Sequence, residues 1–302
     1  EKIMPSVLRT PDDRFRALPD FDFEPHYLDN LPGYEGLRCH YLDLGPQNAE
    51  RTFLCVHGQP TSSSLFRHMI PIFRASGARV VVPDLFGFGR SDKPTEEETY
   101  TFSFHRNMLL AFTSRLELTN LTLVGQDWGG ILGLTLPMEL PHRYSRLLVM
   151  NTTLGTGEAP LSDGFIAWRQ WCRDNPDLSP GRLLGRACPH LTAEEQAAYD
   201  APFPDIEHKA GVRAFPELLP EHPDADGAEI SRQARTWLQG EWQGQSFMAI
   251  GMQDPVLTPP MMYALSRSIR NCQAPHEVAE GGHFLQEWGA DVARQALTSW
   301  QL

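Results

Sequence analysis

The sequence contains no C-x-x-C pair, no basic cluster and no long apolar run, and each absence removes a class of protein. Its 302 residues include five cysteines (Cys39, Cys55, Cys172, Cys188 and Cys272), an odd number without metal-site spacing. Neither a zinc site nor a disulfide framework is therefore expected, and a reducing compartment suits this cysteine usage. No apolar run approaches the roughly 20 residues that cross a bilayer. These absences predict a cytoplasmic protein that holds no metal.

The charge balance narrows the expected partners. The formal net charge is −12, from 26 Lys and Arg against 38 Asp and Glu. Because no basic segment offsets this charge, neither a nucleic acid nor an anionic membrane is an expected partner. We expect a monomer that acts on a small molecule and uses no cofactor.

What the sequence does contain is an alternation of short apolar strands and helical segments. The predicted strands are 37–44, 52–56, 80–82, 121–124, 147–150 and 247–252, and the predicted helices are 104–116, 131–139 and 230–238. Such alternation is typical of an α/β protein with a mostly parallel, doubly wound sheet. Between 153 and 224 the strand-like runs vanish, and prolines, glycines and short helical pieces take their place. We therefore predict a core made of 1–152 and 225–302, with 153–224 inserted as a helical cap.

Residues 125–129, Gly-Gln-Asp-Trp-Gly, stand directly between a predicted strand and a predicted helix. Their order fits the G-x-S-x-G nucleophile elbow, with Asp127 where serine usually stands. The glycines avoid Cβ clashes around a residue in strained backbone geometry. The strain lifts the Asp127 carboxylate clear of the sheet, near a helix N-terminus that favours its ionised form. A simpler interpretation is that Asp127 only caps the helix.

Two further residues complete a possible triad. Asp254 follows the 247–252 strand, and His283 stands in the glycine-rich turn 280–284. The chain order nucleophile, acid, histidine is that of the α/β-hydrolases. The segment His57-Gly58-Gln59-Pro60 fits the second half of an oxyanion hole, in which the backbone N–H groups of Gln59 and Trp128 would act together.

An aspartate nucleophile suits attack on an sp³ carbon, which gives an ester that histidine-activated water can cleave. Two classes of substrate suit this reaction: compounds with a carbon–halogen bond, and epoxides. Epoxide opening needs an acid, usually a pair of cap tyrosines, and the inserted segment has only Tyr199. A departing halide ion needs hydrogen-bond donors that stabilise its negative charge. An indole N–H suits this role because it can only donate. Trp128 and a cap tryptophan, Trp168 or Trp171, can supply them, and for Trp171 we favour apolar packing.

These motifs resemble those of the haloalkane dehalogenases, in particular the subfamily that binds halide between two tryptophans. The resemblance covers nearly the whole chain. It implies Asp127 as nucleophile, His283 as base, Asp254 as the acid partner of the histidine, and Trp128 and Trp168 as halide donors. It also implies a substrate pocket formed by Phe165, Ile131, Phe215, Pro216, Val256 and Leu257. At the position of Gln59, the family that this chain resembles usually has a glutamate. The change to glutamine keeps the backbone N–H and removes the carboxylate.

Three other interpretations remain from the sequence. An epoxide hydrolase of the same fold is disfavoured by the single cap tyrosine and by Trp128. A fluoroacetate-type dehalogenase would need cations just after the elbow, where 131–137 is apolar, so a neutral haloalkane is expected. A catalytically dead hydrolase-fold receptor would typically have lost a triad residue, and none is lost here. We predict hydrolysis of a haloalkane to a primary alcohol, halide and a proton.

Overall fold

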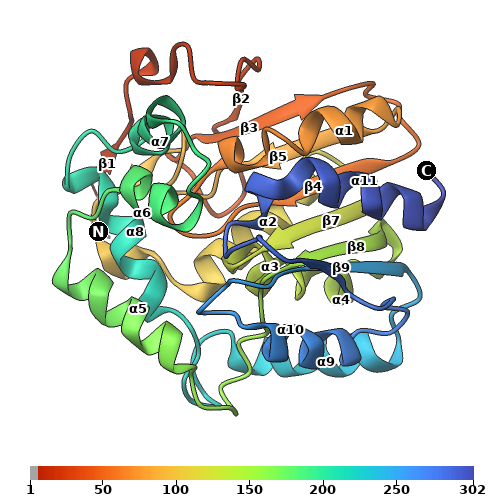
Figure 1. Ribbon diagram of the computed structural model, residues 1–302. Helices are drawn as coiled ribbons and strands as arrows, with labels where there is room; N and C mark the ends of the chain where they lie inside the picture. Colours follow the sequence, from red (N-terminus) through yellow and green to blue (C-terminus); the bar gives the residue numbers. More distant parts are fainter. Residues whose placement is uncertain (1–5) are drawn as a thin grey trace.

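The computed structural model describes residues 6–302, so the first five residues of the predicted core lie outside the described part. Its centre is an eight-stranded sheet with the order β10-β9-β8-β7-β4-β5-β3-β2 (Figure 1). The strands are β2 (His26–Leu28), β3 (Cys39–Leu44), β4 (Thr52–Val56), β5 (Arg79–Pro83), β7 (Leu121–Gln126), β8 (Tyr144–Met150), β9 (Gln245–Gly251) and β10 (His276–Val278). β1 (Val7–Leu8) and β6 (Lys93–Pro94) form a separate antiparallel pair.

The strands from β10 through β5 run parallel, as the alternation of strands and helices predicts. In the middle of the sheet, β4 pairs with β7 from Thr52↔Leu121 to Val56↔Gly125. The edge is different: β3 pairs antiparallel with β5, and β2 pairs antiparallel with β3. The prediction of a mostly parallel sheet is confirmed. The antiparallel edge was not foreseen, because the apolar pattern of a strand does not specify its direction.

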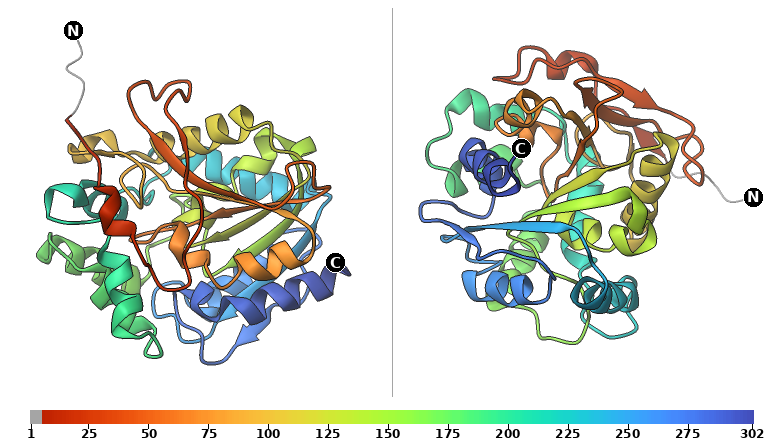
Figure 2. Two further views of the ribbon diagram at one scale, coloured as in Figure 1. Left: turned by 90° about the horizontal axis from the view of Figure 1, so that it is seen from above. Right: turned by 90° about the vertical axis from the view of Figure 1, so that its right-hand side faces the viewer.

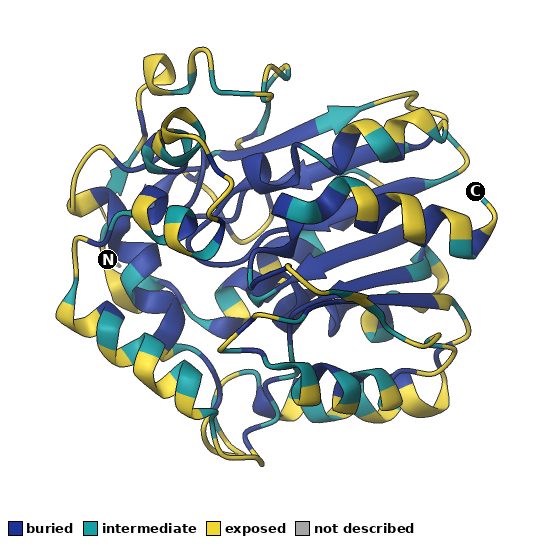
Figure 3. Ribbon diagram, viewed as in Figure 1, coloured by how far each residue is buried: buried dark blue, intermediate teal, exposed yellow. Residues whose placement is uncertain are grey.

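Helices cover both faces of the sheet, and the side chains of β4 show how. Phe53 and Cys55 point to one face, in a buried cluster with Phe73 of α1 (Ile70–Ala75) and residues of α11 (Gly289–Trp300). Leu54 and Val56 point to the other face, in a cluster with residues of α2 (Phe102–Arg115), α9 (Ala228–Gly240) and α10 (Pro259–Arg267). This alternation follows from the two-residue period of a strand. Figure 3 shows the buried sheet between helices with exposed outer surfaces.

The predicted helix 131–139 is two short helices. They are α3 (Trp128–Gly133) and α4 (Leu136–Glu139). The break has two local causes: Pro137 has no N–H to continue the helical hydrogen bonds, and the Thr135 hydroxyl donates to the Leu132 carbonyl oxygen at 2.6 Å. Short 3-10 helices complete the connections: η1 (Asp12–Phe15), η2 (Ser63–Phe66), η3 (Glu97–Thr99), η4 (Pro141–Arg143), η5 (Glu207–Lys209), η6 (Phe215–Glu217) and η7 (Leu285–Trp288).

Between β8 and α9 the chain is helical, with α5 (Asp163–Asp174), α6 (Pro180–Ala187), α7 (Ala193–Asp200) and α8 (Ala210–Ala214). Hydroxyl side chains cap three of these helices at their N-termini: Ser162, Ser179 and Thr192, the last in a capping box with Glu195. Figures 1 and 2 show the four helices gathered beyond one end of the sheet. In residues 6–302, no helix has the length and apolar character that a bilayer crossing requires.

Candidate active site

Asp127 stands at a sharp turn between β7 and α3. Its φ of 52° and ψ of −130° are strained for a residue with a side chain. Two glycines leave room for this turn: a Cβ on Gly129 would overlap the Val56 carbonyl oxygen, and a Cβ on Gly58 would overlap the Asp127 carboxylate. The Asp127 side chain makes no capping hydrogen bond to α3. The simpler interpretation, a helix cap, therefore does not describe this carboxylate.

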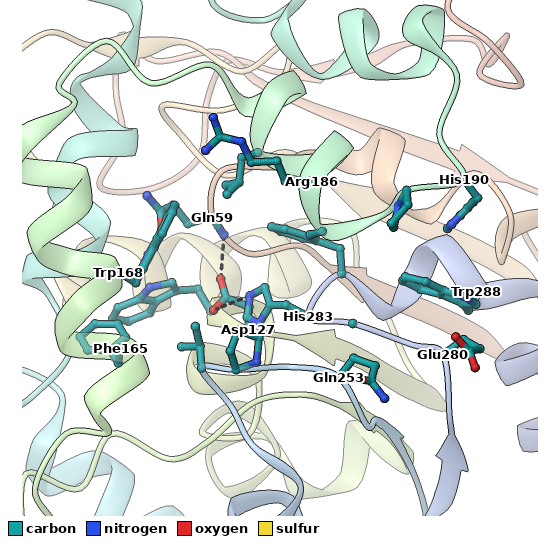
Figure 4. A pocket seen from close by; sticks show the side chains of 18 residues that line it. Gln59, Asp127, Phe165, Trp168, Arg186, His190, Gln253, Glu280, His283 and Trp288 are labelled. Atoms are coloured by element: carbon teal, nitrogen blue, oxygen red, sulfur yellow. Dashed lines mark hydrogen bonds and ion pairs between the residues drawn. The ribbon is translucent and has the colours of Figure 1, made fainter.

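The loops that follow β7, β9 and β10 bring the three predicted triad residues together. His283 Nε2 lies 3.5 Å from Asp127 Oδ1 (Figure 4), and His283 Nδ1 lies 2.8 Å from Asp254 Oδ2. The imidazole therefore stands between the two carboxylates. In this arrangement one ring nitrogen is held by Asp254 and the other faces Asp127, as a base for that site requires.

Asp254 is fully buried, and its charge is met by hydrogen-bond donors. Its Oδ1 accepts from the backbone N–H groups of Val256 at 2.8 Å and Leu257 at 3.1 Å. Its Oδ2 accepts from the Asn151 side-chain amide at 3.1 Å. These bonds compensate for the loss of hydration that burial imposes on a carboxylate. Asn151, at the end of β8, was not among the predicted site residues.

The surroundings of His283 control its charge. Burial disfavours the imidazolium, but the charge of Asp254 and the hydrogen bonds to Asp127 and Asp254 outweigh it and raise the pKa of His283 to about 10. Two anions beside one imidazole stabilise its protonated form. Loss of the negative charge of Asp127 would therefore lower the pKa of His283 and favour the neutral imidazole, which is the form that can accept a proton.

Gln59 contacts the Asp127 carboxylate through its backbone. Its N–H donates to Asp127 Oδ2 at 2.9 Å (Figure 4). This donor was predicted for the oxyanion hole, and in the free protein it lies against the carboxylate that would become the ester carbonyl. The second predicted donor, the Trp128 backbone N–H, belongs to the first residue of α3, directly after Asp127.

A cavity of about 850 Å³ opens onto the Asp127 carboxylate. Its lining includes Trp128, Phe165, Trp168 and Val256, together with residues of α6 and of the segment that precedes α11. Figure 4 shows Phe165 and Trp168 beside Asp127. The remaining lining residues are Gln59, Leu183, Arg186, Ala187, Pro189, His190, Gln253, Pro255, Glu280, Gly282, His283, Phe284 and Trp288. The volume lies in the range of small-molecule sites. A largely apolar cavity that reaches the Asp127 carboxylate suits a small neutral substrate.

Comparisons with known proteins show which family the chain resembles over its length. A family model of the alpha/beta hydrolase fold matches residues 51–290. A haloalkane dehalogenase of Psychrobacter cryohalolentis is 42% identical over 297 residues, which cover 95% of this chain and 96% of that protein. One of Mycolicibacterium paratuberculosis is 38% identical, over 98% of both chains. The structure of the tetrameric haloalkane dehalogenase DpaA from Paraglaciecola agarilytica superposes with a TM-score of 0.95 at 47% identity, over 97% of this chain and 98% of that one.

The chain belongs to the haloalkane dehalogenase family. It is a hydrolase that acts on carbon–halide bonds, and the predicted family, fold and enzyme class are confirmed.

The two cap tryptophans of this dehalogenase stack on each other but differ in their access to the cavity. Trp168 and Trp171 of α5 have ring centroids 5.5 Å apart and planes inclined by 19°. Trp168 lines the cavity, and its indole nitrogen donates to Gln59 Oε1 at 3.3 Å. Both indoles pack against the buried core cluster, and Trp171 is not among the described residues that line the cavity. This placement agrees with packing for Trp171 and leaves Trp168 as the cap candidate for halide binding.

Only part of the predicted pocket of the dehalogenase lines the cavity. Phe165 and Val256 line it, whereas Ile131, Phe215, Pro216 and Leu257 are buried outside its lining within residues 6–302. Phe215 stacks on Trp128 with ring centroids 4.8 Å apart. Phe215 therefore packs against the Trp128 ring and does not contact the cavity. The cavity extends instead toward α6, whose Leu183, Arg186 and Ala187 were not predicted.

Tyr199 lies in a buried polar network outside the cavity lining. The Arg67 guanidinium holds the Glu287 carboxylate at 2.7 and 2.9 Å and contacts the Tyr199 hydroxyl at 3.0 Å, while Tyr199 donates to Glu287. The network joins α7 to η7, which follows His283. Removal of one partner of such a buried ion pair typically costs about 3–5 kcal/mol. The Tyr199 hydroxyl therefore takes part in a structural hydrogen-bond network and does not point into the cavity.

In the described chain, residues 6–302, no group of three or more His, Cys, Asp or Glu side chains is arranged to hold a metal ion.

Proposed function

We propose that this dehalogenase hydrolyses neutral haloalkanes through a covalent ester on Asp127. An Asp127 oxygen attacks the carbon that bears the halogen, so the carbon–oxygen bond forms as the carbon–halogen bond breaks and the halide leaves with the bonding electrons. The indole N–H groups of Trp128 and Trp168 stabilise the halide. The observation that carries this proposal is the chain of contacts at the base of the cavity, 3.5 Å from Asp127 to His283 and 2.8 Å from His283 to Asp254.

In the second step, His283 takes a proton from water as the water oxygen attacks the Asp127 carbonyl carbon. The backbone N–H groups of Gln59 and Trp128 stabilise the tetrahedral oxyanion. Collapse of this intermediate restores the Asp127 carboxylate and releases a primary alcohol, and the proton on His283 passes to solvent. Asp254 orients the imidazole and stabilises its cationic form. The balance is one haloalkane and one water to one alcohol, one halide and one proton.

Halide release from terminal chloro- and bromoalkanes, measured beside the hydrolysis of a matched set of terminal epoxides, tests the substrate class. We expect turnover of the haloalkanes and none of the epoxides, because Tyr199 is engaged by Arg67 and Glu287 and the indole groups cannot donate a proton to an epoxide oxygen as an acid does. Efficient epoxide turnover without halide release would contradict the assignment.

The dependence of the His283 pKa on the charge of Asp127 gives a testable prediction. Asp127→Asn removes the same negative charge as ester formation, so the pKa of His283, about 10 in the free protein, should fall in this variant. NMR titration of the imidazole measures it, and intact mass confirms that the amide persists.

The same shift predicts how stability depends on pH. Because the folded-state pKa is raised above 6.5, charged His283 stabilises the fold below pH 6.5, and this contribution is lost as pH rises through about 10. In Asp127→Asn the loss should occur at lower pH. Equal His283 pKa values in the two proteins would contradict the coupling.

Three broader proposals accompany the mechanism. We propose that residues 153–224 form the cap on a core of 1–152 and 225–302, since α5 and α6 supply walls of the cavity. The five free cysteines support a reducing, cytoplasmic location. The predicted monomer also remains a proposal, which light scattering tests against the tetramer described for the Paraglaciecola enzyme.

A further inference from the structure

The Gln59 side chain connects the nucleophile turn to two cap helices. Its Oε1 accepts a hydrogen bond from the Trp168 indole nitrogen of α5 at 3.3 Å. Its Nε2 donates to the Val212 carbonyl oxygen of α8 at 2.8 Å. Its backbone N–H donates to Asp127 at 2.9 Å. One buried residue therefore contacts the nucleophile and a halide donor candidate at once (Figure 4).

The orientation of the Gln59 amide is fixed by the chemistry of its two partners. An indole N–H only donates and a backbone carbonyl only accepts. A flipped amide would place NH₂ against the indole N–H and two oxygens against each other. Gln59 Oε1 must therefore face Trp168. A glutamate at this position would have no donor for the Val212 carbonyl oxygen, so glutamine is the residue that satisfies both partners.

The bond between Trp168 and Gln59 is the weak member of this set. Its length of 3.3 Å exceeds the usual 2.7–3.2 Å of an N–H···O bond, whereas the bond to Val212, at 2.8 Å, lies within that range. The indole has one N–H, which cannot serve Gln59 and a halide fully at the same time. An anion is the stronger acceptor of the two.

We propose that Gln59 is a positioning residue whose side-chain oxygen accepts from the Trp168 indole N–H when no halide is bound and is displaced from it by halide. This inference rests on the proposed role of Trp168. Gln59 thereby sets halide affinity: it holds the indole toward the nucleophile, and its carbonyl competes for the N–H that stabilises the leaving group. Because the competitor is neutral, halide displaces it without charge repulsion, which a carboxylate at the same place would impose.

Bromide affinity in Gln59→Met and Gln59→Glu tests the competition. Both variants lose the hydrogen bond to Val212. The difference between their bromide Kd values therefore reports the effect of the group that faces the Trp168 indole N–H. We expect the Kd for bromide to fall roughly three- to tenfold in Gln59→Met, which corresponds to the weight of one neutral hydrogen bond. In Gln59→Glu the Kd should rise by at least about tenfold, because a charged competitor binds the donor more strongly and repels the anion. Calorimetry with sodium bromide measures both, and the melting temperature checks folding.

Two controls separate this inference from the assignment beneath it. In a Trp168→Phe background, Gln59→Met should leave the Kd for bromide unchanged, because no N–H remains to compete for. If Trp168→Phe alone binds bromide as tightly as the wild type, the proposed halide role of Trp168 is wrong. If Trp168→Phe weakens binding but Gln59→Met also weakens it, Trp168 keeps its role and the competition is overturned.

A third readout needs no substitution. The ¹⁵N–¹H resonance of the Trp168 indole and the side-chain amide of Gln59 should shift together when sodium bromide is added to the wild type. A bromide-dependent shift of Trp168 with no response of Gln59 would contradict displacement.

Discussion

His283→Phe should release one equivalent of halide and then stop. The phenyl ring fills the space of the imidazole, so Asp127 can still attack the substrate, but no base activates water against the resulting ester. Halide measured after rapid mixing should reach a plateau equal to the enzyme concentration. Intact mass should then show one alkyl group per chain, and peptide mapping should locate it on Asp127.

A matched control for this experiment is His142→Phe, which changes an exposed histidine of η4 in the same way. It should turn over steadily, with no alkyl adduct on the enzyme. Steady turnover by His283→Phe, or a plateau without an adduct on Asp127, would remove His283 from the role of base.

Trp168→Phe should lower kcat/KM by on the order of 10²–10³, the cost that is typical for the loss of one preorganised donor to a developing negative charge. Charge grows on the halogen as its bond to carbon breaks, so the indole N–H contributes more in the transition state than in the ground state. Phenylalanine keeps most of the apolar contact area. The variant should therefore bind bromide more weakly and unfold near the wild-type melting temperature.

Trp171→Phe is the matched control, because the two indoles stack on each other in the same helix and only Trp168 lines the cavity. Its bromide affinity and kcat/KM should change far less. If quenching of tryptophan fluorescence by bromide survives in Trp168→Phe and disappears in Trp171→Phe, the assignment of the two residues is reversed.

The sequence is most informative where a local pattern has a local cause. The 52–56 strand coincides with β4 because an apolar run between turn residues is sufficient to define a buried strand. Asp127, Asp254 and His283 can be identified because each follows a strand, and the carboxyl ends of parallel strands share one edge of the sheet. The break between α3 and α4 was missed, although Pro137 gave a local signal for it.

Features that depend on how the cap docks were not predictable in the same way. Phe215 was assigned to the pocket, yet the helix in which it lies turns it onto Trp128. The ion pair of Arg67 with Glu287 joins residues 220 positions apart, and no spacing in the sequence predicts it. Gln59 was predicted for its backbone N–H, while its side-chain bonds depend on α5 and α8 lying above it.

A single turnover in heavy-oxygen water tests the covalent mechanism most directly. With enzyme in excess over a terminal bromoalkane, water attacks the Asp127 carbonyl carbon, so the oxygen that enters from water should remain in the Asp127 carboxylate. The first alcohol should carry the original aspartate oxygen. Mass spectrometry of the peptide that contains Asp127 should therefore show the label, and the product alcohol should not. Label in the first alcohol and none in Asp127 would mean that water attacks the substrate carbon directly, and the ester would not exist.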